Sequence, residues 1–306
     1  MKAVIVRSFG GPEVLEVAEV PTPEPGPGQV RIRVAAAAVN PVDVQTRTGA
    51  LTAGGLLPKR EVIGIGWDVA GVIDEVGSQV AGFRRGDTVI GLSDRLALPL
   101  KTQAEHVVLD ADAVAAVSAD TDLVAAATLP LGGLTAAQAL DIAAAKPGDT
   151  LLVTGAAGAV GGYTVQLAAL AGVRVVAVAG ADDEELVRGL GAEFFVPRSA
   201  DLPAAVRDLV PGGVHTAVDA ASVGMLALDG VRSGGSLVSV LGNAPMPLRG
   251  IRVSNVWIRA DGPRLTELAA VGLRCRVADV LPLDEVAEAH RRLEAGGLRG
   301  RLVLVP

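Results

Sequence analysis

A glycine-rich segment at residues 155–162, GAAGAVGG, has the composition and spacing to bind a diphosphate. The apolar run Leu151–Val153 before it has strand character, and apolar residues at helical spacing follow it. A turn without bulky side chains lets backbone N–H groups approach a diphosphate, and a helix N-terminus adds about half a positive charge. The alternative is an ordinary tight turn, since Ala156 replaces the first glycine of the usual G-x-G-x-x-G fingerprint. We interpret the segment as a dinucleotide site formed by Gly155, Ala156, Gly158, Ala159, Val160 and Gly161.

The elements around this segment alternate between strand-like and helical patterns. Six strands are expected, at Leu151–Thr154, Val173–Val178, Glu193–Val196, His215–Asp219, Ser236–Leu241 and Ile251–Val256. Helix-like runs lie between most of them. Six strands in this alternation make a complete doubly wound parallel sheet.

The first 110 residues differ, because short β-branched runs there alternate with glycine- and proline-rich turns. The expected strands are Met1–Val6, Val14–Val20, Gln29–Val39, Val69–Val76, Asp87–Gly91 and Glu105–Leu109. Helical patterns then cover Asp120–Leu129 and Leu131–Ala145. A tail from about Gly262 comes too late to extend the doubly wound sheet, and we expect it to return to the first domain. The sequence therefore predicts an α/β protein with a β-rich domain at 1–120, a dinucleotide-binding domain at 121–261 and a C-terminal return at 262–306.

Composition excludes several function classes. The net charge of −7 argues against nucleic acid or an anionic membrane surface as the main partner. Charges, glycines and prolines interrupt every apolar run before it reaches the roughly 18 residues that span a bilayer. The single cysteine, Cys275, permits no internal disulfide and fits a reducing compartment. We expect a cytoplasmic protein that binds neither nucleic acid nor a membrane.

Several motifs, in order along the whole chain, resemble the medium-chain dehydrogenase/reductase superfamily, on its zinc-independent quinone oxidoreductase branch. They are PGPGQVRIRVAAAAVNPVD at 25–43, GWDVAGVIDEVG at 66–77, RRGDTVIGL at 84–92, QAEHVVL at 103–109, LPLGGLTAAQAL at 129–140, GAAGAVGG at 155–162 and RLVLVP at 301–306. The resemblance implies a β-rich, GroES-like catalytic domain, a six-stranded Rossmann domain and a cleft between them. It also implies a nicotinamide-dependent reductase.

The resemblance also allows a comparison of the positions that hold a catalytic zinc ion in other members of the superfamily. Zinc-dependent relatives use a cysteine and a histidine at positions that match Asn40 and Trp67 here. A catalytic zinc needs three protein ligands of N, S or O type, and neither residue replaces the missing ones. His106, His215 and His290 are far apart in the sequence. We therefore predict that the protein holds no metal.

Without a metal, hydride would pass from a nicotinamide to a quinone or an α,β-unsaturated carbonyl. Asn40 is the first candidate to stabilise the developing enolate oxygen, and its alternative role is to pin the loop before Pro41. Asp43 matches a family aspartate and would position groups, relay a proton or cap the loop. Gln45 stands where the family commonly has a tyrosine, and Tyr163, the only tyrosine, cannot replace it. Water is the remaining proton source.

The resemblance to this superfamily also implies further residues at the cofactor site. Thr135 is expected near the nicotinamide, with helix capping as the alternative. NADPH is the expected cofactor on family precedent, although Asp182 favours NADH, since a carboxylate would repel a 2′-phosphate. Arg198 and Arg301 could compensate. The remaining expected contacts are Gly180, Leu241, Gly242 and Asn243.

Two other functions remain open. An enoyl-thioester reductase, as in polyketide or fatty-acid pathways, would favour a basic entrance, and the basic residues near the expected cleft are Arg47, Lys59, Arg60, Arg95 and Lys101. A non-catalytic nucleotide-binding structural or scaffold protein is the alternative of another class. Relatives that pair through the last strand of the Rossmann sheet imply a homodimer formed through Ile251–Val256.

Overall fold

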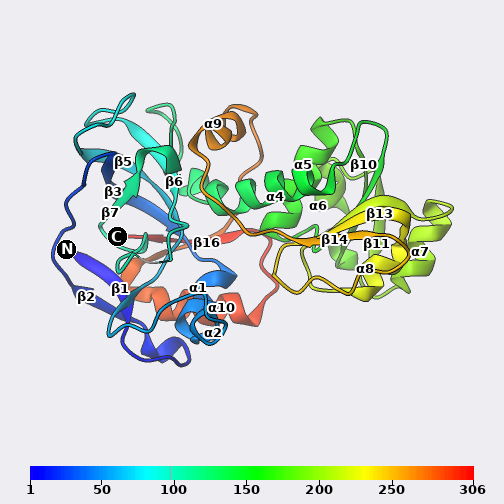
Figure 1. Ribbon diagram of the computed structural model, residues 1–306, viewed down its shortest axis with the longest axis horizontal. Coiled ribbons are helices and arrows are strands. Elements are labelled where there is room, and N and C mark those ends of the chain that lie inside the picture. The colour runs from blue at the N-terminus through cyan, green and yellow to red at the C-terminus, as the bar shows by residue number, and fades with distance from the viewer. Residues whose placement is uncertain (97) are drawn as a thin grey trace. The chain divides into compact units, whose positions relative to one another are not determined.

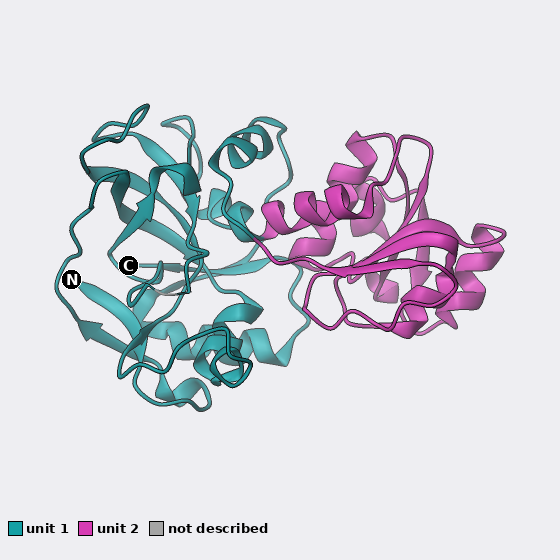
Figure 2. Cartoon of the chain, in the orientation of Figure 1, with its two compact units in different colours: residues 1–131, 259–306 teal, residues 132–258 magenta. Residues whose placement is uncertain are grey.

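The computed structural model describes residues 1–96 and 98–306. The chain forms two compact units, one of residues 1–131 and 259–306 and the other of residues 132–258 (Figure 2). The first unit therefore takes its residues from both ends of the chain. Among the described residues, no helix is long and apolar enough to cross a membrane.

The first unit is built on two sheets (Figure 1). The larger has the order β15-β16-β3-β5-β6-β8, with β7 paired to β3. Its strands are β3 (Gln29–Ala38), β5 (Asp68–Val76), β6 (Thr88–Leu92), β7 (His106–Asp110), β8 (Val114–Ala116), β15 (Val277–Pro282) and β16 (Arg301–Val305). The smaller sheet has the order β2-β1-β4, from β1 (Lys2–Val6), β2 (Glu16–Glu19) and β4 (Ile63–Gly64). The C-terminal strand β16 pairs with β3, which ties the end of the chain to this unit.

Short helices surround these sheets. They are α1 (Pro41–Arg47), α2 (Ala50–Ala53), α3 (Leu123–Ala126), α9 (Gly262–Ala270), α10 (Val286–Ala295) and the 3-10 turns η1 (Pro12–Val14), η2 (Ala111–Ala113) and η4 (Leu283–Glu285). The sequence pattern missed α1 and α2, because helices of seven and four residues are too short to show a clear period. It also extended α3 too far: Asp122 caps this helix by accepting from the backbone N–H groups of Val124 and Ala125.

The second unit is a six-stranded parallel sheet with the order β11-β10-β9-β12-β13-β14. Its strands are β9 (Thr150–Thr154), β10 (Arg174–Ala179), β11 (Phe194–Pro197), β12 (Val214–Asp219), β13 (Val231–Ser239) and β14 (Arg252–Asn255). Its helices are α5 (Ala159–Leu170), α6 (Glu184–Gly189), α7 (Leu202–Leu209), α8 (Met225–Gly230) and the 3-10 turn η3 (Ala181–Asp183), with α4 (Leu129–Ala143) spanning the boundary between the units. The order reverses between β9 and β12, as in a doubly wound fold, and confirms the predicted six-stranded Rossmann sheet.

The alternation of side chains along each strand builds a core on both faces of this sheet. Leu151 and Val153 of β9 pack on one face with residues of α4, α5 and α6, and Leu152 packs on the other with residues of α7 and α8. Because both faces are buried, the strands read as continuous apolar runs. This core fixes the turn after β9.

Candidate active site

The glycine-rich turn lies between β9 and α5, as the sequence predicts. Gly155 has a positive φ of 62°. A Cβ on Gly161 would lie 2.2 Å from the carbonyl oxygen of Gly155, so glycine at this position lets α5 pack directly against the turn. Ala156 stands in place of the usual glycine without a positive φ, and its methyl group is buried in the core. The residues present therefore fit a diphosphate at the N-terminus of α5.

Gly158 precedes α5 in extended backbone. A Cβ here would lie 3.1 Å from the carbonyl oxygen of Gly155, which is tight but not prohibitive. A larger, branched side chain would project from this position into the space that a diphosphate needs.

Asp219 and Thr154 hold the loop beside this turn, and the sequence reasoning missed their role. The Thr154 hydroxyl donates to Asp219 Oδ1 over 2.6 Å, and Gly224 N donates to Asp219 Oδ2 over 2.8 Å. Ala221 N and Val223 N also donate to this carboxylate. A Cβ on Gly155 would lie 3.0 Å from the carbonyl oxygen of Ala220, so the loop 220–224 lies directly against the glycine turn. An aspartate at the end of a predicted strand was the available signal.

The ends of β10 and β11 bring two other predicted residues together. A Cβ on Gly180 would lie 3.3 Å from Arg198 Nη2, so the guanidinium lies beside the backbone at the end of β10. Asp182 is exposed in η3, two residues further on. Asp183 Oδ2 would lie still closer to that Cβ, at 2.9 Å, so an anion bound here would meet the positive charge of Arg198 and the negative charges of Asp182 and Asp183.

The end of β13 carries the remaining predicted cofactor contacts. Leu241, Gly242 and Asn243 are exposed and follow the carboxyl end of this strand. Ser239 Oγ donates to Asn243 Oδ1 over 2.9 Å, and Val240 N donates to the carbonyl oxygen of Asp219. These residues therefore lie at the same edge of the sheet as the glycine turn.

Thr135 lies inside α4 and is buried. It is well past the first turn of this helix, so the capping alternative is wrong. The structure leaves its expected role near the nicotinamide as a prediction.

In the first unit, Asn40 and two carboxylates form a buried cluster. Asn40 Nδ2 donates to Asp68 Oδ2 over 2.6 Å and to the carbonyl oxygen of Ala38 over 3.4 Å. Its backbone N–H donates to Asp43 Oδ2 over 2.8 Å, and Gln103 Nε2 donates to the same oxygen over 3.2 Å. Both hydrogens of the Asn40 amide are thus engaged within the protein, and the side chain is fully buried. This geometry favours the alternative in which Asn40 pins the loop before Pro41.

Burial also changes the acidity of the two carboxylates. It raises the pKa of Asp43 to about 7, and the charge of Asp68 raises it further, whereas the hydrogen bond from Asn40 lowers it. Burial raises the pKa of Asp68 to about 6, against the hydrogen bonds from Leu131 N and Asn40. Both carboxylates therefore release their protons closer to neutral pH than an exposed aspartate does.

Arg301, predicted as a cofactor contact, is also close enough to this cluster to act on it electrostatically. It lies buried in β16, and its positive charge lowers the pKa values of both Asp43 and Asp68. Because β16 pairs with β3, which leads into Asn40, the guanidinium is held among these carboxylates. Its predicted contact with a 2′-phosphate stays a prediction.

Lys101 is a second buried cation, although the sequence analysis expected it at a basic entrance to the cleft. Its Nζ donates to the carbonyl oxygen of Ser93 (2.9 Å), to Ser93 Oγ (3.1 Å) and to the carbonyl oxygen of Arg95 (2.8 Å). It lies 5.0 Å from the centre of the Trp67 ring. Burial lowers the pKa of Lys101 to about 8. The lysine therefore holds Ser93 and Arg95 from inside.

The predicted basic entrance is largely absent. Arg47 is buried and pairs with Glu294 over 2.6 Å, Lys101 is buried, and Arg95 pairs with Asp110. Only Lys59 and Arg60 of the five basic residues remain exposed outside such pairs. The structural support for a tethered acyl carrier is correspondingly reduced.

Gln45 lies on α1, two residues after Asp43, and is half-buried. Successive helical residues are 100° apart, so Gln45 and Asp43 point to different sides of α1. Tyr163 is buried in α5, against Gly132 of α4. Neither residue lies in the buried carboxylate cluster.

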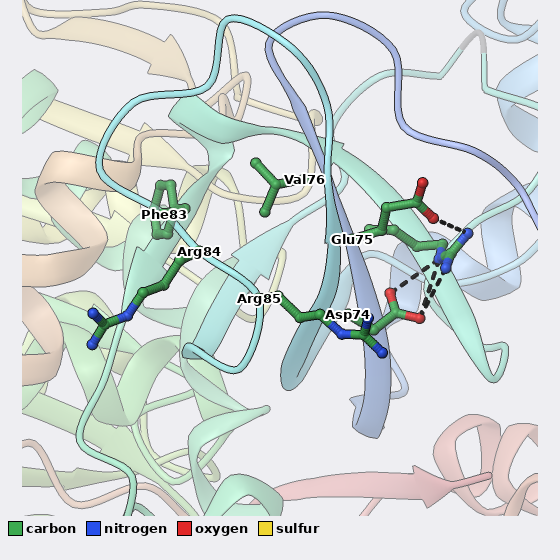
Figure 3. Close-up of a pocket in the computed structure, with 7 residues that line it drawn as sticks. Asp74, Glu75, Val76, Phe83, Arg84 and Arg85 are labelled. Atoms are coloured by element: carbon green, nitrogen blue, oxygen red, sulfur yellow. Dashed lines mark hydrogen bonds and ion pairs between the residues drawn. The ribbon is translucent and has the colours of Figure 1, made fainter.

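The described part of the first unit contains a pocket and a groove, and none of the predicted site residues lines either of them. One, of about 560 Å³, is lined by Asp74, Glu75, Phe83, Arg84 and Arg85 together with Arg31 and Val76 (Figure 3). Arg31 pairs with both Asp74 and Glu75, which neutralises its charge. The other, of about 630 Å³, is a mainly apolar groove between α3 and α9.

No group of three or more His, Cys, Asp or Glu side chains in residues 1–96 and 98–306 is arranged to hold a metal ion. His106 lies in β7, His215 in β12 and His290 in α10. His290 is fully buried, and burial lowers its pKa to about 4.

Comparison with known proteins agrees with this geometry. Residues 26–128 match the alcohol dehydrogenase GroES-like domain family, and residues 159–260 match the zinc-binding dehydrogenase family. Among curated proteins, the quinone oxidoreductase of Sus scrofa is 30% identical over 100% of this chain and 98% of its own length. The chloroplastic NADPH-dependent alkenal/one oxidoreductase of Arabidopsis thaliana is 31% identical over 100% of this chain and 80% of its own length.

Solved structures agree as well. The quinone oxidoreductase from Coxiella burnetii superposes with a TM-score of 0.88 and 31% identity, covering 100% of this chain and 99% of that protein. Similarity of this extent spans both units and the glycine turn. The chain belongs to the medium-chain dehydrogenase/reductase superfamily, on its quinone oxidoreductase branch.

Proposed function

We propose that this protein is an NADPH-dependent reductase of quinones and α,β-unsaturated carbonyls that requires no metal ion. The observation that carries the proposal is the glycine turn, which Gly161 and the Asp219 loop hold in the form of a diphosphate cradle. Relatives named as a quinone oxidoreductase and an NADPH-dependent alkenal/one oxidoreductase support this substrate class and this cofactor.

The bound cofactor would supply hydride, and hydride plus one proton converts a quinone to a hydroquinone. Gly155, Gly158 and Gly161 would admit the diphosphate to the N-terminus of α5. Arg198 would contact the 2′-phosphate, and its place beside Gly180 supports NADPH over NADH despite the exposed Asp182. Thr135, Leu241, Gly242 and Asn243 would border the nicotinamide half.

In the first unit we assign a positioning role to the cluster around Asn40. Its hydrogen bond to Asp68 ties the junction between β3 and α1 to the start of β5, and its backbone bond to Asp43 holds the first turn of α1. We propose that water delivers the proton, since Gln45 replaces the tyrosine acid and Tyr163 is buried.

The direct test is NADPH consumption with a panel of quinones and enones, using wild type and Gly158→Val. We expect turnover with the wild type. The variant should remain folded by circular dichroism but bind NADPH more than about a hundredfold more weakly, because several charge-assisted N–H contacts worth at least about 3 kcal/mol are lost. Gly189→Ala is the matched control, since a Cβ at Gly189 of α6 meets no atom within 4 Å. Normal NADPH binding by Gly158→Val would contradict the proposed diphosphate site.

Two further expectations belong to this proposal. We propose a homodimer through β14, which is an edge strand of the Rossmann sheet. A cytoplasmic location, with no nucleic-acid or membrane partner, also stays a prediction.

A further inference from the structure

Trp257 is exposed although it is one of the largest apolar side chains of the protein. Its relative exposure is 68%, whereas Trp67, the only other tryptophan, is 6% exposed. Met246 and Leu241, on the preceding loop, are also exposed. Exposed apolar side chains on one loop and strand end are typical of places where an apolar group binds.

Hydrogen bonds fix Trp257 at the carboxyl edge of the Rossmann sheet. Val256 N donates to the carbonyl oxygen of Ser239, which links the end of β14 to the end of β13. Ala244 N donates to Asn255 Oδ1 over 3.0 Å, which holds the loop after β13 against β14. A Cβ on Gly242 would lie 3.9 Å from Trp257 Cη2, so the indole lies beside this loop.

The topology determines which part of the cofactor faces this edge. In a doubly wound sheet the dinucleotide lies across the carboxyl ends of the strands, and each half of the sheet holds one mononucleotide. The glycine turn follows β9, and Arg198 follows β11 in the β9–β11 half. The 2′-phosphate half therefore belongs to β9–β11, and the nicotinamide half to β12–β14. Trp257 lies in this second half, about 14 Å from β9 at the usual strand spacing.

We propose that the Trp257 indole is the surface on which a flat aromatic acceptor stacks, so that the enzyme favours quinones over small aliphatic enones. This inference rests on the proposed function. A quinone ring is planar and electron-poor, the indole is electron-rich, and their offset stacking adds to the burial of apolar area. A small aliphatic enone offers no ring and gains little from the indole.

The test compares 1,4-naphthoquinone with but-3-en-2-one in wild type, Trp257→Leu and Trp257→Phe. We expect Trp257→Leu to lower kcat/KM for naphthoquinone roughly fivefold, chiefly through KM, because aromatic pairs contribute about 0.5–1.5 kcal/mol. The value for the enone should change less than about twofold, and Trp257→Phe should restore most of the loss. Leu170→Ala is the control, because Leu170 is 66% exposed at the other end of α5, away from the carboxyl edge.

Equilibrium dialysis of naphthoquinone with the NADP⁺-bound protein gives a readout independent of turnover. Trp257→Leu should raise the Kd for naphthoquinone by a similar factor, and an unchanged Kd overturns the inference even if no acceptor is reduced. Wild type that binds naphthoquinone but reduces neither acceptor would instead contradict the proposed function. Sedimentation tests whether the indole instead contacts a second copy of the chain. If Trp257→Leu converts a dimer to a monomer and lowers kcat/KM for both acceptors equally, the indole belongs to a dimer interface and the inference is wrong.

Discussion

At the end of β10, Arg198 and Asp182 place opposite charges near the expected ribose of the cofactor. Replacing Arg198 with alanine should lower the ratio of kcat/KM for NADPH to that for NADH roughly 5–30-fold. This corresponds to about 1–2 kcal/mol, the scale of one charge-assisted contact. Asp182→Arg should raise the same ratio by a similar amount. Steady-state kinetics with both cofactors measures the change, and Arg188→Ala, which removes an exposed arginine paired with Glu184, is the control. Unchanged ratios in both variants would place the discriminating contact elsewhere.

Asp43 makes stability depend on pH. Burial raises its pKa to about 7 in the folded protein, whereas an unfolded aspartate titrates near 3.9. The folded state therefore binds a proton at Asp43 more tightly than the unfolded state does. The contribution of Asp43 to the free energy of unfolding is fully present below about pH 4 and is lost as the pH rises through 7. The loss is at most about 4 kcal/mol, since one pKa unit corresponds to about 1.36 kcal/mol.

Urea unfolding at pH 5 and pH 8 measures this effect. We expect Asp43→Asn to lose less stability between these pH values than wild type does, because an amide does not ionise. Asp208→Asn, on the exposed face of α7, should follow the wild type. Parallel curves for Asp43→Asn and wild type would show that Asp68 or another group carries the titration.

At the scale of elements, the loop 220–224 depends on Asp219 at the end of β12. Asp219→Ala removes the acceptor for Thr154 and three backbone N–H groups. We expect the free energy of unfolding to fall by about 3–5 kcal/mol, since hydrogen bonds to charged groups are each worth about 1.5–3 kcal/mol and are not additive. NADPH affinity should fall at least about tenfold, because this loop supports the glycine turn.

Urea unfolding and NADPH titration test this prediction together. Asp219→Asn keeps one acceptor oxygen and should lose about half as much stability. Asp208→Ala is the control and should change neither quantity. If Asp219→Ala binds NADPH as wild type does, the loop does not support the turn.

For the molecule as a whole, we predict that the purified protein contains no stoichiometric zinc and keeps its activity in strong chelators. The reason is the distribution of the soft ligands: the three histidines lie in β7, β12 and α10, and Cys275 lies between α9 and β15. Elemental analysis measures the metal content. About one zinc per chain, lost together with activity on chelation, would sink this prediction.

The Rossmann fold and the glycine turn could be predicted from the amino-acid sequence alone. Both depend on local signals: continuous apolar runs for strands buried on two faces, and small residues where a strand turns into a helix. The order of the motifs likewise identified the family. Each strand, turn or motif is encoded within about 30 consecutive residues, and the order of these local signals along the chain is itself part of the sequence.

The contacts of the isolated polar residues could not be predicted without the folded structure. Asn40 and Asp68 are 28 positions apart but share a hydrogen bond, and Lys101, which reads as a surface residue, is buried against Trp67. Arg301 joined Asp43 and Asp68 because β16 pairs with β3. The burial and the contacts of a polar side chain depend on how strands distant in the sequence pair. The identity of one charged residue therefore does not predict whether it faces water, a carboxylate or a cofactor.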